Sequence, residues 1–169
     1  GQWGGLLIAG KATNNLTLAA NGPFQAGVGD GKLCVADGIG TFEGFASTNS
    51  KDQFGVTPAQ FDDNDNSGIL RYVSIRHAGA ILQVGGEINA LSLGSVGRGT
   101  TIEHVEIISS ADDGIEVWGG TVNLKYVAML FGNDDNLDWD DGWQGKAQFI
   151  FVLKTDPSAS VDSDNGFEM

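Results

Sequence analysis

Hydrophobic and polar residues alternate in short runs along the chain, and clusters of turn residues separate the runs. The segments Ile102–Gly120 and Leu124–Gly142 superimpose at an offset of 22 residues without a gap. Each segment holds two alternating runs, with Ser-Ala-Asp-Asp-Gly or Gly-Asn-Asp-Asp-Asn between them. A period of two predicts β-strands, and the turn residues predict where those strands end. The repeated unit is therefore two short strands with a turn between them.

The same unit recurs elsewhere along the chain with longer connections. A later copy has its two halves at residues 148–153 and 164–169. An earlier copy has its halves at residues 70–76 and 90–93, and residues 5–8 fit the second half of a still earlier one. Internal repeats of this length indicate stacked units that bury their apolar faces against one another.

The repeat length selects among the repeat architectures. Propeller blades need about 40 residues and four strands, and no segment shows the period of a helical solenoid. About 22 residues at ~3.3 Å per residue make one circuit of a small prism. We therefore predict an all-β fold, a single-stranded right-handed parallel β-helix with coils of about 22 residues. The inward ladders are then Leu6, Leu91, Ile115, Leu137 and Phe167; Ile8, Leu93, Val117, Trp139 and Met169; and Val73, Val105, Val127 and Ile150.

The regular pattern extends over one predicted β-helix domain, residues 1–169. Residues 11–67 depart from it, and we interpret them as an irregular coil with long loop excursions. Gly1 and Met169 both lie inside patterned sequence, so we interpret the chain as a fragment of a longer one.

Composition narrows the range of partners. Nine basic and 22 acidic residues give a net charge of −13, which argues against nucleic acid and against an anionic membrane surface as partners. No apolar run reaches the ~18 residues that a membrane span requires. Cys34 is the only cysteine, so no internal disulfide can form. The chain has 26 glycines, a share roughly twice the average of ~7%, and this favours a fold with many tight turns.

Five blocks of the sequence are distinctive: Trp3–Ala12, Asn64–His77, Glu87–Gly97, Thr101–Val105 and Asp112–Glu116. Together they resemble a family of secreted bacterial β-helix surface proteins. The resemblance covers nearly the whole chain and implies a β-helix that is secreted or displayed on the bacterial cell surface. It implies no catalytic residues.

The alignment stacks acidic residues on one outer edge, where neighbouring strands lie ~4.8 Å apart. One column holds Asp112, Asp134 and Asp164, and a second holds Asp113, Asp135 and Asn165. A third, pointing outward, holds Glu116, Asp138 and Glu168. Two carboxylates ~5 Å apart repel by roughly 1 kcal/mol in water and ~3 kcal/mol at an effective dielectric near 20.

Three arrangements would relieve this repulsion: plain solvation, protonation of some carboxyls, or a bound cation such as Ca²⁺. The cofactor is accordingly none or Ca²⁺. The metal candidates are Asp112, Asp113, Asp134, Asp135 and Asp164.

An enzymatic alternative uses the same turns. Residues 110–114 and 133–136 faintly resemble the Asp-bearing turns of the polygalacturonase family, which implies a polysaccharide hydrolase or lyase acting through Asp112, Asp113, Asp134 and Asp135. The His-Gly turn and Arg-x-Lys of that family are missing here, and no lysine aligns into the acidic columns as the base of a lyase would.

Two tryptophans, Trp118 and Trp143, are predicted to lie outside, where aromatic faces suit sugar rings. With Glu116, Asp138 and Asp140 they make a candidate glycan-binding surface, and packing under a neighbouring loop is the alternative. The leading hypothesis is a non-catalytic extracellular scaffold, adhesin or glycan-binding module. Its expected partners are a polysaccharide or cell-surface glycan, and further copies of the chain joined through the β-helix ends.

Overall fold

The alternating runs form parallel strands in two sheets. The computed structural model describes residues 3–18, 33–45, 49–83, 86–154 and 165–168. The five-stranded sheet has the order β1 (Leu6–Ala9), β8 (Leu91–Gly94), β10 (Ile115–Trp118), β12 (Leu137–Asp140) and β14 (Phe167–Glu168). The four-stranded sheet has the order β13 (Ala147–Leu153), β11 (Asn123–Leu130), β9 (Thr101–Ile108) and β5 (Ile69–Arg76).

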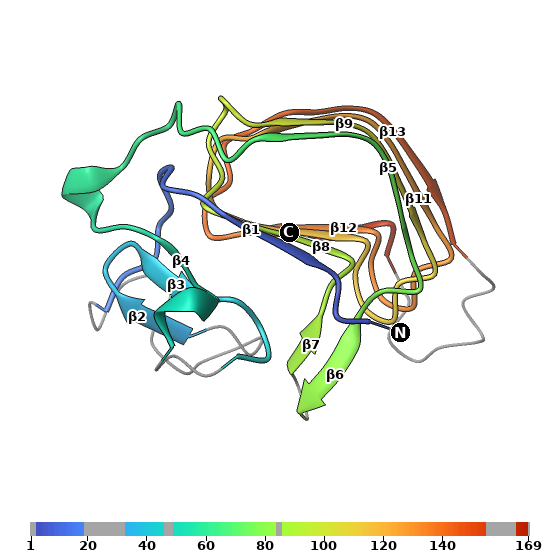
Figure 1. The fold of residues 1–169 in the computed structure, drawn as a ribbon, viewed down its shortest axis with the longest axis horizontal. Coiled ribbons are helices and arrows are strands. Elements are labelled where there is room, and N and C mark those ends of the chain that lie inside the picture. Colours follow the sequence, from blue (N-terminus) through green and yellow to red (C-terminus); the bar gives the residue numbers. More distant parts are fainter. Residues whose placement is uncertain (1–2, 19–32, 46–48, 84–85, 155–164, 169) are drawn as a thin grey trace.

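The chain passes back and forth between these two sheets, so that equivalent strands stack one upon another (Figure 1). Within each sheet every pair of neighbours is parallel. These pairings confirm the predicted all-β class with parallel sheets. The spacing between paired residues is 22 from Ile115 to Leu137, but 32 from Ile69 to Thr101, so one constant repeat length does not describe the strands.

Most members of the predicted ladders fill the space between the two sheets, but Phe167 on the last strand is 51% exposed, and Met169 lies outside the described residues. Leu6 pairs with Leu91, Leu91 with Ile115, and Ile115 with Leu137. The middle members are fully buried, whereas Leu6 at the end of the sheet is half-buried. The ladder that contains Val105 and Val127 follows the predicted register as well. In the short strands, period-two alternation therefore predicts which side chains point inward, whereas in β9 the core residues Ile102 and Val105 are three apart.

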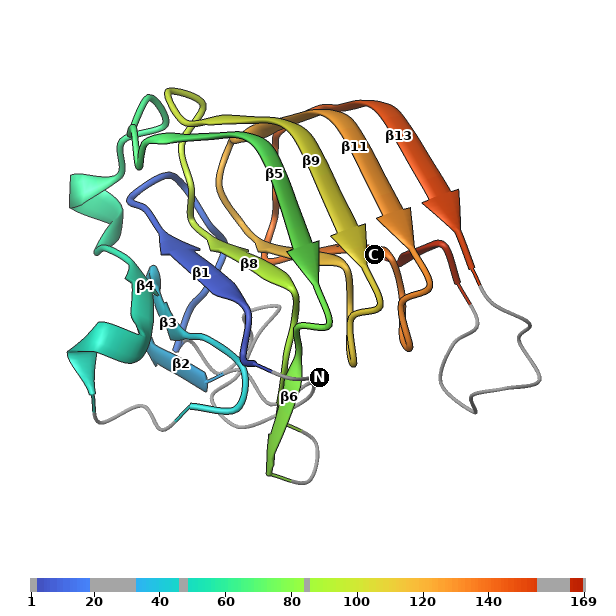
Figure 2. The ribbon, with the colours of Figure 1, turned by 45° about the vertical axis from the view of Figure 1, so that its right-hand side comes forward.

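Each strand of the four-stranded sheet bends at a residue with positive φ. Tyr72, His104, Tyr126 and Phe149 have φ values of 53° to 62°, an uncommon conformation for residues with side chains. Their rings stack in one column with centroids 4.6, 4.7 and 5.0 Å apart. Figure 2 shows the four bent strands side by side. The bend places this aromatic column on the outside of the molecule, where the rings at both ends are more than half exposed.

Additional strands cover part of the outer face of the five-stranded sheet (Figure 1). An antiparallel sheet contains β2 (Leu33–Ala36), β3 (Ile39–Thr41) and β4 (Gln53–Gly55), with 3-10 turns at Ser50–Asp52 and Pro58–Gln60. A hairpin contains β6 (Ala80–Gln83) and β7 (Gly86–Ile88). The antiparallel sheet and the 3-10 turns lie in the range 11–67, of which residues 19–32 and 46–48 are outside the described part of the chain. None of the described helical segments is long and apolar enough to cross a membrane.

Candidate functional site

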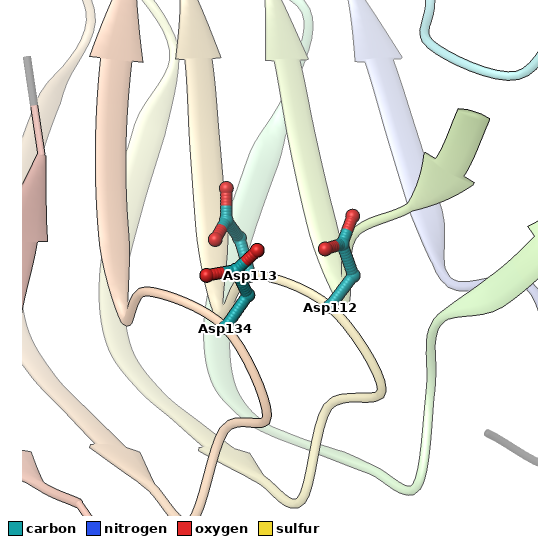
Figure 3. A group of neighbouring side chains, drawn as sticks. All are labelled: Asp112, Asp113 and Asp134. Atoms are coloured by element: carbon teal, nitrogen blue, oxygen red, sulfur yellow. The ribbon is translucent and has the colours of Figure 1, made fainter. Parts of the chain in front are cut away.

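Two neighbouring turns bring the acidic residues together, as the alignment predicted. The turn after β9 carries Asp112 and Asp113, and the turn after β11 carries Asp134. The turns are joined by backbone hydrogen bonds, with Gly114 N–H donating to the Asp135 carbonyl and Asn133 N–H donating to that of Ser110, both at 3.1 Å. Figure 3 shows the three side chains pointing to the same side of these turns. Regular stacking of the turns therefore forces like charges into proximity.

The carboxylates of the described residues form two groups of three that share one member. Asp112, Asp113 and Asp134 form the first group, and Asp113, Glu116 and Asp138 form the second. In each group one oxygen from every side chain lies within 4.8 Å of the others. Glu116 and Asp138 are opposite each other on β10 and β12, as predicted. We call these five residues the acidic edge.

The second group of carboxylates is more unusual than the first, because two of its three side chains are buried. Glu116 points away from the core between Ile115 and Val117, yet it is only 2% exposed, and Asp113 is 9% exposed. The Asn89 side-chain amide donates a hydrogen bond to Glu116 Oε2. Asn89 itself is fully buried, and its amide oxygen has no hydrogen-bond partner. Buried carboxylates this close together require a counter-charge or protons.

The proton affinity of the acidic edge reflects this crowding. Burial, with the charges of Asp134 and Glu87, raises the pKa of Asp112 to about 7. Burial and the charge of Glu116 raise the pKa of Asp113 well above its usual range. Protons or a cation would therefore both stabilise the folded chain at this edge.

A pocket of about 280 Å³ opens beside the first group. Ile81, Glu87, Ala111 and Asn133 line it together with Asp112 and Asp134. Glu87 comes from the β6–β7 hairpin, which no repeat pattern marks as adjacent to the acidic turns. The hairpin thus adds a carboxylate and one wall, and sequence alignment could identify neither.

Two predicted metal ligands are not part of the acidic groups described above. Asp135 is almost fully buried, and its Oδ1 accepts a hydrogen bond from Asn165 N–H. It stacks beside Asp113 as predicted, but it belongs to neither group of three. Asp164 lies outside the described residues. Asp140, predicted as a ligand-binding residue, pairs with Trp118 at the opposite end of the short strands and is also outside both groups.

The prediction that Trp118 is exposed is wrong. Its side chain does point away from the β-helix core, but it is only 1% exposed, because Phe42 and Phe54 pack against it. The Phe54 ring stacks on the indole with centroids 5.8 Å apart. Trp118 therefore anchors the β2–β4 sheet and offers no ring face to a sugar.

Trp143 also packs against protein. It is half-buried against the core, with its ring 6.0 Å from that of Trp139, and its indole N–H donates to the Val122 carbonyl. The structure therefore favours packing over exposure for Trp143. Neither tryptophan supports the predicted aromatic glycan surface.

One cation that alignment placed elsewhere reaches the acidic edge. Lys154 follows β13 and is outside the acidic columns, but its ammonium group donates a hydrogen bond to the Asp134 backbone carbonyl. A long side chain spans the distance between columns, which a column-by-column comparison cannot detect.

Comparison with known proteins identifies a family. The model of a family described as a pectate-lyase-like β-helix domain matches residues 1–169. No curated protein and no solved structure matches the chain significantly. The match covers the two parallel sheets, the turns with the acidic edge and the segments that pack on the outside. The chain therefore belongs to the family of pectate-lyase-like β-helix domains.

Proposed function

We propose that this β-helix is an exported, non-catalytic surface module whose acidic edge binds Ca²⁺. The observation that carries the proposal is the pair of three-carboxylate groups joined through Asp113, with Asp113 and Glu116 buried. Ca²⁺ prefers about six to eight oxygen ligands and accepts carboxylates, amide carbonyls and water. The acidic edge supplies carboxylates, and Asn89 supplies a buried amide oxygen beside them.

The open side of the acidic edge suggests how such a module would meet a polysaccharide. The 280 Å³ pocket adjoins Asp112 and Asp134, so a cation held there would keep some coordination positions toward solvent. Hydroxyl or carboxylate groups of a glycan would fill these positions. Contact through the cation replaces the contact through Trp118 and Trp143 that the sequence suggested.

Calcium binding predicts a rise in the melting temperature. A ligand at 100 times its Kd stabilises the folded state by about 2.7 kcal/mol, or roughly 5–10 °C for a chain of this size. Melting curves with CaCl₂, MgCl₂ and chelator measure this shift. We expect Ca²⁺ to stabilise the chain more than Mg²⁺, because Mg²⁺ demands a stricter octahedral arrangement.

The shared ligand provides the matched variants. Asp113→Asn should abolish the calcium-dependent rise, since both groups lose a charged ligand, whereas Asp140→Asn should retain it. In chelator, Asp113→Asn should melt above the wild type, because it removes a buried like charge. A wild type that does not respond to Ca²⁺, or an equal response in Asp113→Asn, contradicts the proposal.

A second candidate is a polysaccharide lyase, which the position of Lys154 favours. In such a reaction a base removes the proton next to a uronic acid carboxylate, and a C=C bond forms as the neighbouring C–O bond to the leaving sugar breaks. The departing oxygen takes up a proton. Lys154 in its neutral form is the candidate base beside a Ca²⁺ that neutralises the substrate carboxylate.

Ultraviolet absorbance of the unsaturated product separates the two functions. Polygalacturonate with CaCl₂ would yield that absorbance with the wild type and with Lys125→Gln, but not with Lys154→Gln. Calcium binding without any product supports the non-catalytic module. Product formed at the same rate by Lys154→Gln would exclude Lys154 as the base.

A further inference from the structure

A second pocket opens where β9 begins, at the other end of this strand from the acidic edge. It has a volume of about 220 Å³ and is lined by Arg98, Thr100, Thr101, Ile102, Glu103, Asn123 and Lys125. These residues belong to the turn before β9 and to the first residues of β9 and β11. Both strands have neighbours on either side in the four-stranded sheet, so neither wall lies at a sheet edge (Figure 2). We call this site the β9–β11 pocket.

The β9–β11 pocket contains two cationic side chains, and the first of them, Arg98, is loosely held. One guanidinium nitrogen lies 3.6 Å from Asp63 Oδ2 and another lies 3.4 Å from Asn64 Oδ1. Charge-assisted hydrogen bonds are usually ~2.7–2.9 Å long. The Asp63 carboxylate is fixed separately by a hydrogen bond from Thr13 N–H at 3.0 Å. Because the Arg98 side chain is about half exposed, its guanidinium group keeps donors for a ligand.

Lys125 provides the second positive charge of the pocket. Its ammonium group lies over the Tyr126 ring, 5.0 Å from the ring centroid, and within the described residues it forms no ion pair. Glu103, the register partner of Lys125 on β9, is bound by Arg71 with an N–O distance of 2.6 Å. Because Arg71 neutralises this carboxylate, the pocket keeps the positive charge of Arg98 and Lys125.

Neutral donors line the same pocket. The Thr100 hydroxyl accepts a hydrogen bond from Ser67 N–H at 2.8 Å, so its own hydrogen is available to a ligand. The Asn123 side-chain oxygen accepts a hydrogen bond from Lys146 N–H at 3.1 Å, and its NH₂ group is a further donor. The acceptor oxygens of Thr100 and Asn123 are thus engaged within the chain, whereas their donors can bind a ligand that carries acceptors.

Two positive charges with neutral donors around them suit a compact anion that has several acceptor oxygens. A sulfate or phosphate group offers at least three such oxygens, which an arginine fork and a lysine point charge both bind. The acidic edge does not oppose such a ligand. The eight residues of β9, at ~3.3 Å each, separate the two sites by well over the ~8 Å screening length at physiological salt.

We propose that the β9–β11 pocket binds a tetrahedral oxyanion, a sulfate or phosphate group that is free or esterified to a sugar. Arg98 and Lys125 balance the charge of the anion. Thr100 and Asn123 donate hydrogen bonds to its oxygens. The site is separate from the acidic edge and does not depend on Ca²⁺.

NMR titration of the isotope-labelled 169-residue chain tests the site directly. The probes are sodium sulfate, sodium phosphate and a sulfate ester of glucose, added in chelator, with sodium chloride at matched ionic strength and glucose as references. We expect saturable shifts of the backbone amides of residues 98–103 and 123–125 with the three oxyanions and with neither reference. Tighter binding of the ester than of free sulfate would assign the site to a modified sugar, and equal binding would assign it to the anion alone.

Charge variants locate the binding residues. Arg98→Gln and Lys125→Gln should each weaken sulfate binding about 3- to 10-fold, because each removes one partly exposed contact to the anion. Arg76→Gln makes the same change of charge on β5, outside the pocket, and should leave sulfate binding unchanged. Equal weakening in Arg76→Gln would show that the anion responds only to net charge and would overturn the proposal.

Glu103→Gln predicts a gain of affinity, which misfolding cannot mimic. The substitution removes a carboxylate from the pocket lining and frees Arg71, so sulfate binding should tighten about 3-fold. The proposal is also overturned if the amide shifts with sulfate follow those with chloride, if neither Arg98→Gln nor Lys125→Gln weakens binding, or if Glu103→Gln does not strengthen it.

Discussion

At the scale of single residues, the acidic edge is a place where regular stacking opposes electrostatics. Asp112, Asp113 and Asp134 are in turns that suit aspartate locally. Stacking the turns then brings their carboxylates within 4.8 Å of one another. Burial and the repulsion between these carboxylates raise the pKa of Asp112 and Asp113, so both side chains bind protons more tightly than usual. At a pH too high for these carboxyls to stay protonated, bound Ca²⁺ would offset the same repulsion.

The raised pKa values predict how stability depends on pH. A carboxyl whose pKa is higher in the folded chain binds protons more tightly when folded, so it stabilises the fold at low pH. That contribution is lost as pH rises from about 4 through about 7, the pKa of Asp112. In chelator, the melting temperature should therefore fall by several degrees between pH 5 and pH 8.

Calcium and the Asp113→Asn variant serve as the controls for this dependence. Ca²⁺ favours the ionised carboxylates and should flatten the decline, with protons released on binding below pH 7. Asp113→Asn should show a smaller decline than the wild type. A melting temperature in chelator that rises steadily from pH 5 to pH 8 would contradict the assignment.

At the scale of strands, packing depends on position within the stack. The ladder Leu6, Leu91, Ile115 and Leu137 was identified from alternation because every second residue of each strand faces the apolar core. The bend at Tyr72, His104, Tyr126 and Phe149 was not predicted. No local preference places aromatic residues at positive φ, and the stacked column exists only when neighbouring strands are in register.

Two leucines of one ladder test the importance of neighbours on both sides. Leu91→Ala should lower the free energy of unfolding by about 2–5 kcal/mol, the range for a buried leucine in a packed core. Leu6→Ala should cost about half as much, because Leu6 is half-buried on the edge strand β1. Urea denaturation measures both values, and equal losses would contradict this account.

At the scale of the whole molecule, the outer segments decide which surface is available. Phe42 and Phe54 cover Trp118, and Gly94 on β8 leaves the space that the Phe54 ring occupies, since a Cβ there would lie 2.3 Å from it. The β6–β7 hairpin adds Glu87 to the pocket beside Asp112. Trp118, which was predicted to bind a glycan, is therefore buried, whereas the hairpin forms a pocket beside Asp112 that was not predicted.

The sequence by itself determined the strands of the two parallel sheets, most of the inward ladders and the columns that stack Asp112 on Asp134 and Glu116 on Asp138. These features follow from local alternation, turn residues and a gapless repeat, which can all be recognised in the sequence. Only the tertiary structure decided that Trp118 is buried, that Glu116 lies beside Asn89, and that Lys154 reaches Asp134. Those contacts join segments with no common period, so their geometry depends on how loops and the hairpin pack against the finished sheets.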